Sequence, residues 1–225
     1  MKRIILWCSA VLVLLNVGGA EAQAADKTGA FTIARLKYRG GGDWYNDPSI
    51  LPNMLQYLQQ QTGILCASEE IQVTPEDEIF FSSPVLFMTG HGRISFSEKE
   101  AARLRTFLSN GGFLFADDDY GMNDHFRREM KKVFPDKALV PIPFSHEIFH
   151  CFFSFPNGLP KIHEHDGGPP EAWGYFQDGR LVVFYAFNTN ISDGWADPDV
   201  HKDPVPVREQ ALRMGTNIFF YALTH

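Results

Sequence analysis

The sequence predicts an α/β fold: a three-layer sandwich with a mainly parallel central sheet, helices on both faces and a β-hairpin toward the C-terminus. The first observation is that short apolar runs alternate with segments of helical periodicity from residue 31 to residue 142. Such alternation is typical of parallel sheets, whose crossovers are right-handed. The second is an Asp-Gly pair, Asp178 and Gly179, between two apolar runs, which is a strong hairpin signal.

Start and stop signals justify the individual elements. Asp47 followed by Pro48 marks a helix start and Gly63 a helix stop. Ser97 with Glu100 three residues later is a capping box, which opens another helix. The expected elements, in order, are a strand at 31–38, a helix at 48–62, strands at 71–73 and 84–89, a helix at 98–110, a strand at 113–116, a helix at 123–133, a strand at 138–142, hairpin strands at 173–177 and 180–187, and a helix at 207–223.

The first 24 residues have the pattern of an export signal. Lys2 and Arg3 precede an apolar run at 4–15, and small residues as far as Ala24 offer cleavage sites. The apolar run is shorter than the roughly 20 residues that a membrane-spanning helix needs. We therefore expect a cleaved signal peptide at 1–24, a single domain at 25–225, and a periplasmic or secreted protein without a membrane span.

Charge narrows the choice of partners. The chain has 20 Lys and Arg against 27 Asp and Glu, a formal net charge of −7. No basic patch is available to attract nucleic acid, so we expect a small molecule or a protein as partner. Cys66 and Cys151 are the cysteines outside the signal, and an oxidising compartment permits a bridge between them, which the sequence leaves open.

Polar side chains gather where the predicted strands end. The apolar strand at 113–116 runs directly into Asp117, Asp118 and Asp119. In open α/β sheets the carboxyl ends of the strands form the edge at which ligands bind. Adjacent carboxylates repel one another, so one of them can take a raised pKa and act as an acid or base, or the set can hold a cation. The alternative is that Asp118 or Asp119 only caps the following helix.

We predict a site for a small polar or cationic ligand at this edge. The candidate catalytic residues are His91, Asp117, Asp118, Asp119 and His146. The candidate ligand-binding residues are Arg39, Asp43, Asn188, Asp193 and Trp195. The sequence leaves open whether the protein is an enzyme. The hypotheses are a hydrolase-like site that uses Asp and His as acid and base, a non-catalytic binding module, and an interaction protein recognised through the aromatic loop at 144–155.

Residues 146–150 match HExxH, the zinc-peptidase string. On a helix the two histidines would bind zinc and Glu147 would activate water. Prolines on both sides and the phenylalanines that follow leave little room for a regular helix. We therefore expect no cofactor, although the sequence is compatible with a bound divalent metal. The alternative is a metallopeptidase with His146, His150 and Glu164 as metal ligands. A second tract rich in metal-ligating residues, 163–166, is predicted to be an exposed loop.

A set of motifs over residues 31–225 resembles one family. The motifs are RGGGDWY at 39–45, TGHG at 89–92, GGFLFADD at 111–118, HEIFH at 146–150, DGR at 178–180, SDGWAD at 192–197 and the final TH. Together they resemble the exported bacterial family called domain of unknown function 4159. The resemblance implies a flavodoxin-like fold of the class I glutamine amidotransferase type. Amidotransferases have a cysteine where this chain has Asp118 or Asp119, and the family often has proline in place of Glu147.

Overall fold

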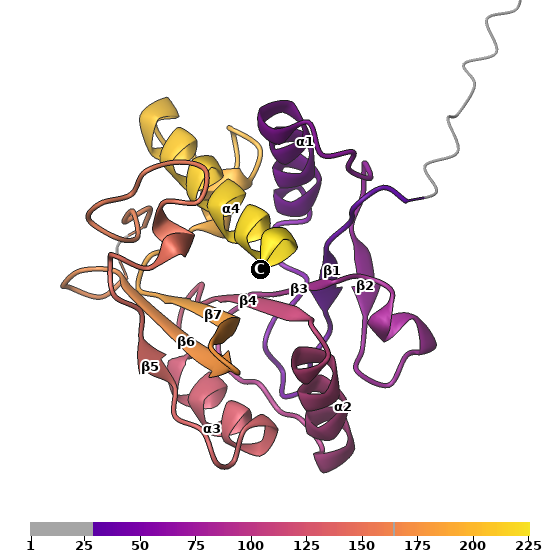
Figure 1. Cartoon of the computed structure of the whole chain (residues 1–225). Coiled ribbons are helices and arrows are strands. Elements are labelled where there is room, and N and C mark those ends of the chain that lie inside the picture. Colours follow the sequence, from indigo (N-terminus) through magenta and orange to yellow (C-terminus); the bar gives the residue numbers. More distant parts are fainter. Residues whose placement is uncertain (1–28, 164) are drawn as a thin grey trace, which may run out of the picture.

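The computed structural model describes residues 29–163 and 165–225, so the predicted export signal at 1–24 lies outside the described residues (Figure 1). The strands and α-helices follow one another in the predicted order, and three short 3-10 helices (η) that we did not predict lie between them in the described residues. They are β1 (Ala34–Leu36), α1 (Ile50–Thr62), β2 (Ile71–Val73), η1 (Glu78–Phe81), β3 (Val85–Met88), α2 (Glu98–Ser109), β4 (Phe113–Asp117), α3 (Asn123–Val133), β5 (Val140–Pro141), η2 (Glu147–Phe149), β6 (Glu171–Gln177), β7 (Arg180–Phe187), η3 (Ser192–Trp195) and α4 (Val205–Thr224).

The strands form one sheet in the order β2-β1-β3-β4-β7-β6-β5. The first five strands in this order are parallel, whereas β6 pairs with β7, and β5 with β6, in antiparallel fashion. The β6–β7 pair is the predicted hairpin. Its turn residues, Asp178 and Gly179, have φ values of 51° and 83°, as a two-residue turn with two positive φ angles requires. The prediction of an α/β fold with a mostly parallel sheet is confirmed.

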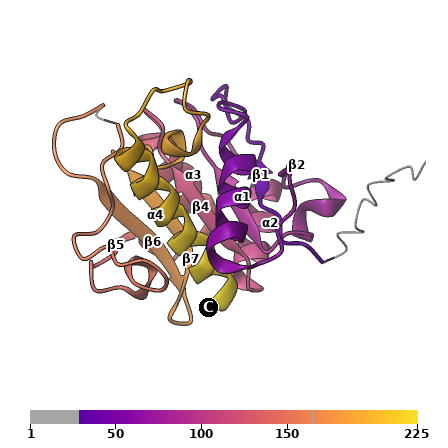
Figure 2. The ribbon, with the colours of Figure 1, turned by 90° about the horizontal axis from the view of Figure 1, so that it is seen from above.

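Helices cover both faces of the sheet. Helices α1 and α4 lie on one side, and α2 and α3 lie on the other (Figures 1 and 2). Successive strand residues point to opposite faces, so each strand contributes to both cores. Phe87 and Phe115 pack with α1 and α4, whereas Leu86 and Leu114 pack with α2 and α3. The apolar runs in the sequence are continuous because both faces of these strands are buried.

The order of the strands determines where loops converge. The chain leaves β1, crosses through α1 to β2 on one side, and then returns to β3 on the other side of β1. The loops that follow β1 and β3 therefore diverge at the carboxyl edge of the sheet, and such a switch point is where open α/β sheets bind ligands. The loops after β4 and β7 leave the sheet at the same edge, because these strands are parallel to β3.

Two expectations drawn from composition can be compared with this fold. Cys151 carries a free thiol, 3.3 Å from the carbonyl oxygen of Asn217, so Cys66 and Cys151 are not bridged to each other. Over residues 29–163 and 165–225, none of the helices combines the length and the apolarity that crossing a bilayer requires.

Candidate functional site

Polar side chains from four loops meet at the carboxyl edge of the sheet. The loops that follow β1, β3, β4 and β7 each contribute at least one side chain. These are Asp43, Asn46 and Asp47 after β1, His91 after β3, Asp119 after β4, and Asn190 and Asp193 after β7. The residues are distant in sequence, and the sheet brings them together.

His91 joins two carboxylates. Its Nδ1 lies 3.0 Å from Oδ2 of Asp43 and 3.2 Å from Oδ2 of Asp119, and its backbone N–H donates to Oδ1 of Asp43. Burial disfavours the charged ring, but the carboxylates of Asp119 and Asp43 outweigh this effect and raise the pKa of His91. Burial likewise disfavours the charge on Asp43, yet hydrogen bonds from His91 lower its pKa. The imidazole itself is half exposed and faces solvent on its other side.

Glycine at position 90 permits this contact. The residue has φ 136°, and a Cβ atom there would meet Tyr38 Oη and lie 3.0 Å from Oδ1 of Asp43. Any larger side chain would therefore push the Asp43 carboxylate away from the ring of His91. In the TGHG motif, Thr89 follows the end of β3 and Gly90 allows the close approach of Asp43. His91 then supplies the imidazole.

Asp119 is the buried carboxylate of the site. Its Oδ1 accepts a hydrogen bond from Nδ2 of Asn190 at 2.8 Å, and its Oδ2 accepts one from Nδ2 of Asn46. Burial, followed by repulsion from Asp193, raises the pKa of Asp119 to about 7. At neutral pH the group can therefore both give and accept a proton, which suits general acid–base catalysis.

The other two carboxylates of the triplet contact the protein itself. Oδ2 of Asp117 accepts the backbone N–H of Ser192 at 2.6 Å, and burial raises the pKa of this carboxyl to about 7. Asp118 accepts the N–H of Met122, directly before α3, and the hydroxyl of Tyr185 at 2.7 Å. The contacts of Asp118 are those of the alternative expectation, in which an aspartate stabilises the start of the next helix.

Two histidines outside the predicted site contact acidic side chains of the same cluster. Nδ1 of His163 lies 2.8 Å from Oδ2 of Asp193, and its Nε2 lies 3.0 Å from Oδ1 of Asp203. Nε2 of His201 lies 3.2 Å from Oδ2 of Asp47. The exposed loop expected at 163–166 is only partly correct, because the side chain of His163 is 22% exposed. Hydrogen bonding to Asp193 raises the pKa of His163 to about 9.

Two overlapping groups of side chains have the spacing of metal ligands. In each group, one ligand atom per residue lies within 4.8 Å of the others. The groups are His163, Asp193 and His201, and Asp47, Asp119 and Asp193. Asp193 belongs to both, so the two groups form one continuous cluster at the carboxyl edge.

A comparison with known protein families identifies the family of this chain. A family described as a domain of unknown function (DUF4159) matches residues 32–223. The chain belongs to the DUF4159 family. A search of curated proteins found no significant match. The resemblance inferred from the motifs is thus confirmed at the level of the family.

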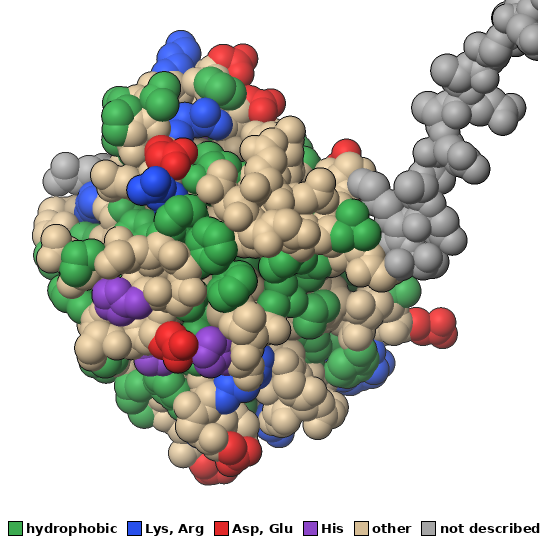
Figure 3. Space-filling view, turned by 45° about the horizontal axis from the view of Figure 1, so that its top comes forward, with side chains coloured by type: hydrophobic (Ala, Val, Ile, Leu, Met, Phe, Trp, Pro, Cys, Tyr) green, Lys and Arg blue, Asp and Glu red, His purple; other side chains and the backbone are tan. Residues whose placement is uncertain are grey.

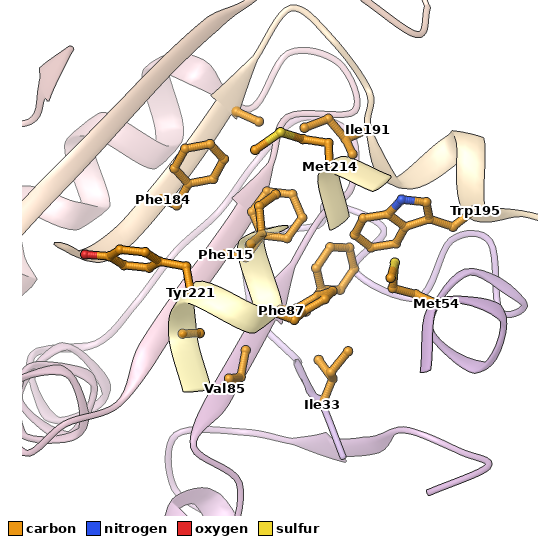
Figure 4. Close-up of a cluster of buried hydrophobic side chains, with 14 of the residues drawn as sticks. Ile33, Met54, Val85, Phe87, Phe115, Phe184, Ile191, Trp195, Met214 and Tyr221 are labelled. Carbon is orange, nitrogen blue, oxygen red and sulfur yellow. The ribbon is translucent and has the colours of Figure 1, made fainter. Parts of the chain in front are cut away.

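Of the predicted ligand-binding residues of this DUF4159 domain, Arg39 and Trp195 lie away from the cluster, whereas Asn188 lines the same pocket as Asp119 and Asn190. Arg39 pairs with Glu100 at the start of α2, at 2.7 Å. Asn188 accepts a hydrogen bond from Nζ of Lys161 at 2.7 Å and so fixes the loop that carries His163. Trp195 is fully buried against Phe87 and Phe115 (Figure 4), and its Nε1 donates to the carbonyl oxygen of Ala211 at 2.9 Å. The expectation that Trp195 contacts a ligand is therefore wrong, since its ring is part of the core.

The HEIFH segment of the DUF4159 domain lies at the opposite edge of the sheet. The ring of His146 packs against Phe176, near the end of β6, and against Tyr221, near the end of α4. The prediction that His146 shares a pocket with the aspartates is thus wrong, because the loop between β5 and β6 takes it to the amino edge. In Figure 3, a tilted view of the side seen in Figure 1, histidine side chains lie next to an acidic side chain.

The contacts within HEIFH also differ from those of a zinc peptidase. Residues 147–149 form a single 3-10 turn in place of an α-helix. Nδ1 of His146 accepts the N–H of Ile148, Nε2 of His150 lies 2.8 Å from the carbonyl oxygen of Phe144, and Glu147 pairs with His225. Each group is therefore occupied by a different partner. Glu164, the expected third ligand, lies outside the described residues.

Proposed function

We propose that the domain binds a small polar or cationic ligand over the carboxyl ends of its strands and acts on it as a hydrolase, with His91 and Asp119 as the proton-transfer groups. The observation that carries this proposal is the contact of Nδ1 of His91 with two carboxylates from different loops, at 3.0 Å and 3.2 Å. An imidazole held in this way by carboxylates has a fixed orientation and is stabilised in its protonated form.

The roles follow from exposure and from the two ring nitrogens. Because Nδ1 faces the carboxylates, Nε2 is directed to the half-exposed side of the ring, where a ligand would lie. In the hydrolytic step, the oxygen of a water molecule forms a bond to the substrate while the bond to the leaving group breaks. The carboxylate of Asp119 takes the proton from water, and Nε2 of His91 gives its proton to the leaving group. Asp43 acts as a positioning residue that orients the ring.

We also propose that the fold is flavodoxin-like and that the protein is exported. The parallel part of the sheet has the order β2-β1-β3-β4-β7, which corresponds to the flavodoxin-like order 2-1-3-4-5 and supports a flavodoxin-like, glutamine amidotransferase-like class. The pattern at 1–24 supports export to the periplasm or beyond the cell. Sequencing the N-terminus of the protein recovered from its compartment tests this location, because retention of Lys2 and Arg3 would contradict cleavage.

Turnover of generic substrates tests the hydrolase proposal. The full-length protein and the variants His91→Gln and Asp119→Asn would be compared on chromogenic esters, amides, phosphate esters and glycosides. The control is Asp136→Asn, which removes an exposed carboxylate just beyond the end of α3. We expect turnover of at least one class, with kcat/KM reduced about 100-fold to 10,000-fold in the two site variants and unchanged in the control.

The melting temperature separates a catalytic role from a structural one. His91→Gln should melt near the unaltered protein, since His91 is half exposed. Full activity in His91→Gln would contradict the proposal. So would the absence of turnover in every class by a protein whose melting temperature still rises with a small cation, which indicates a binding module.

A further inference from the structure

We propose that His163, Asp193 and His201 bind one divalent transition-metal ion at the carboxyl edge of the sheet, next to the pair formed by His91 and Asp119. The three residues come from two separate stretches of chain, the loop before β6 and the loop between β7 and α4. One ligand atom from each lies within 4.8 Å of the others, and Nδ1 of His163 is 2.8 Å from Oδ2 of Asp193. Ligand atoms about 2.1 Å from a common metal ion are about 3.0–3.4 Å apart, so small shifts suffice.

The second nitrogen of His163 has the partner that a metal-bound histidine needs. Its Nε2 lies 3.0 Å and 3.1 Å from the two carboxylate oxygens of Asp203, whose side chain is 10% exposed. Histidines that bind metals through one ring nitrogen usually donate the other N–H to a carboxylate, which fixes the orientation of the ring. Asp203 thus leaves Nδ1 of His163 as the nitrogen directed at Asp193.

A buried amide beside the cluster lacks a partner for its oxygen. Asn190 is 1% exposed, and its Oδ1 has no hydrogen-bond partner among the residues that the structure describes. Its Nδ2 lies 2.8 Å from Oδ1 of Asp119, 3.2 Å from Oδ2 of Asp193 and 2.7 Å from Nε2 of His165. An amide nitrogen has two protons for these three neighbours, so the side chain is directed into the cluster and cannot satisfy it alone. A cation that coordinates Asp193 would leave Nδ2 with two acceptors and so relieve that mismatch.

The charge of the cluster also favours a cation. Five carboxylates lie at this edge, and within the described ranges their ion pairs are made with histidines and none with Lys or Arg. The pairs are Asp43 and Asp119 with His91, Asp193 and Asp203 with His163, and Asp47 with His201. Asp119 and Asp193 are buried and the other three are partly buried, and negative charge removed from water is costly unless it is paired or coordinates a metal.

The donor set indicates the class of ion. Two imidazoles and one carboxylate suit Zn²⁺, Mn²⁺, Fe²⁺ or Co²⁺, whereas Ca²⁺ and Mg²⁺ are usually held by oxygen ligands alone. Asp47, whose Oδ2 lies 3.2 Å from Nε2 of His201, adds a further carboxylate at the rim of the site. The site differs from the HEIFH segment, which lies at the other edge of the sheet.

Metal binding to the full-length protein tests the proposal directly. The protein would be stripped with a chelator and titrated with Zn²⁺ by calorimetry and with Co²⁺ by visible absorption, with Mg²⁺ and Ca²⁺ as competitors. We expect one ion per chain, Co²⁺ bands typical of nitrogen and oxygen ligation, and no competition by Mg²⁺. His163→Ala and His201→Ala should weaken Zn²⁺ binding at least about 100-fold, and Asp203→Asn about 10-fold to 100-fold.

Controls separate loss of ligands from loss of structure. His125→Ala, on α3 and outside both ligand groups, should bind Zn²⁺ as the unaltered protein does. His201→Gln keeps the volume of the side chain, and far-UV circular dichroism reports whether each variant folds. The proposal is overturned if the unaltered protein takes up no Zn²⁺ or Co²⁺, or if folded His163→Ala and His201→Gln bind them with unchanged affinity.

The result can be told apart from that of the hydrolase proposal. A protein that binds Zn²⁺ through these residues but has no turnover contradicts the hydrolase proposal alone. A protein that depends on His91 for turnover but retains no Zn²⁺ or Co²⁺ contradicts the metal proposal alone.

Discussion

The unfolding free energy of Asp117→Asn should increase, relative to that of the unaltered protein, as the pH rises. The side chain of Asp117 is fully buried at the end of β4, and its Oδ1 has no hydrogen-bond partner among the described residues. Burial, offset only in part by the hydrogen bond from the backbone of Ser192, raises the pKa of Asp117 from an ordinary 3.8 to about 7. Asparagine has nearly the same shape, keeps an oxygen for Ser192 and never becomes charged.

The size of the effect follows from the two pKa values. Between about pH 4 and about pH 7 the folded protein keeps a proton that the unfolded chain has already released. The stability that this proton confers is fully present below about pH 4 and is lost as the pH rises through about 7. The whole loss is on the order of 4 kcal/mol, and the part between about pH 5 and about pH 8 is on the order of 3 kcal/mol.

Urea denaturation near pH 5 and near pH 8, with chelator present, measures the change. The difference in unfolding free energy between Asp117→Asn and the unaltered protein should shift by about 3 kcal/mol in favour of the variant from about pH 5 to about pH 8. The exposed substitution Asp136→Asn should show no such shift. The reasoning is refuted if the difference in unfolding free energy between Asp117→Asn and the unaltered protein does not change with pH, or changes in favour of the unaltered protein. Asp117 would then be charged in the folded protein at little cost in free energy.

Three further substitutions have defined outcomes. Gly90→Ala should destabilise more than Gly92→Ala, because both residues have positive φ but only a Cβ at position 90 meets Tyr38 and Asp43; equal melting temperatures would contradict this. Glu129→Gln should cost about 2 kcal/mol in urea denaturation at neutral pH, since this buried carboxylate accepts three hydrogen bonds. Those bonds lower the pKa of Glu129 despite its burial. The loss of unfolding free energy in Glu129→Gln should therefore become smaller as the pH falls through that pKa, because the unaltered side chain then also loses its charge. Trp195→Phe should cost about 2 kcal/mol in unfolding free energy and leave turnover per folded molecule unchanged, which an activity assay corrected for the folded fraction would check.

The sequence predicted the fold where local patterns and burial agree. The strands at the centre of the sheet read as unbroken apolar runs because helices cover both of their faces, and the capping box at Ser97 opens α2 as predicted. The agreement is poorer at the edge of the sheet. The strand expected at 138–142 contains only Val140 and Pro141, because proline has no N–H to donate to a ladder and is restricted to the edges of sheets.

The site was predicted as far as it depends on strand ends. His91 and Asp119 follow the ends of β3 and β4 within three residues, so their meeting is expected from the parallel pairing of these strands. His163 and His201 belong to long loops whose paths are fixed by tertiary contacts, such as the bond between Lys161 and Asn188, and no local pattern indicates those contacts.

The placement of Trp195 shows the same limit at the scale of one helical turn. Asp193 and Trp195 are two residues apart in η3, and in a helix with three residues per turn such side chains point in widely different directions. Asp193 faces His163 at the carboxyl edge, whereas Trp195 faces Phe87 and Phe115 in the core. A motif that spans a site therefore divides its residues between binding and packing, and the sequence alone does not say which is which.

The distribution of unsatisfied groups supports a binding role for the carboxyl edge. In the described part of the chain, the buried side-chain atoms without a hydrogen-bond partner are Oδ1 of Asn46, Oγ1 of Thr89, Oδ1 of Asp117 and Oδ1 of Asn190. They follow β1, β3, β4 and β7, or end these strands, so all of them lie at the edge that carries the acidic cluster. Each such atom costs about 1–3 kcal/mol in folding free energy, and proteins tolerate this cost mainly where a ligand, an ion or water completes the set. A cation that enters the cluster should therefore raise the stability of the folded state with its concentration, as expected for a ligand that binds only the native protein.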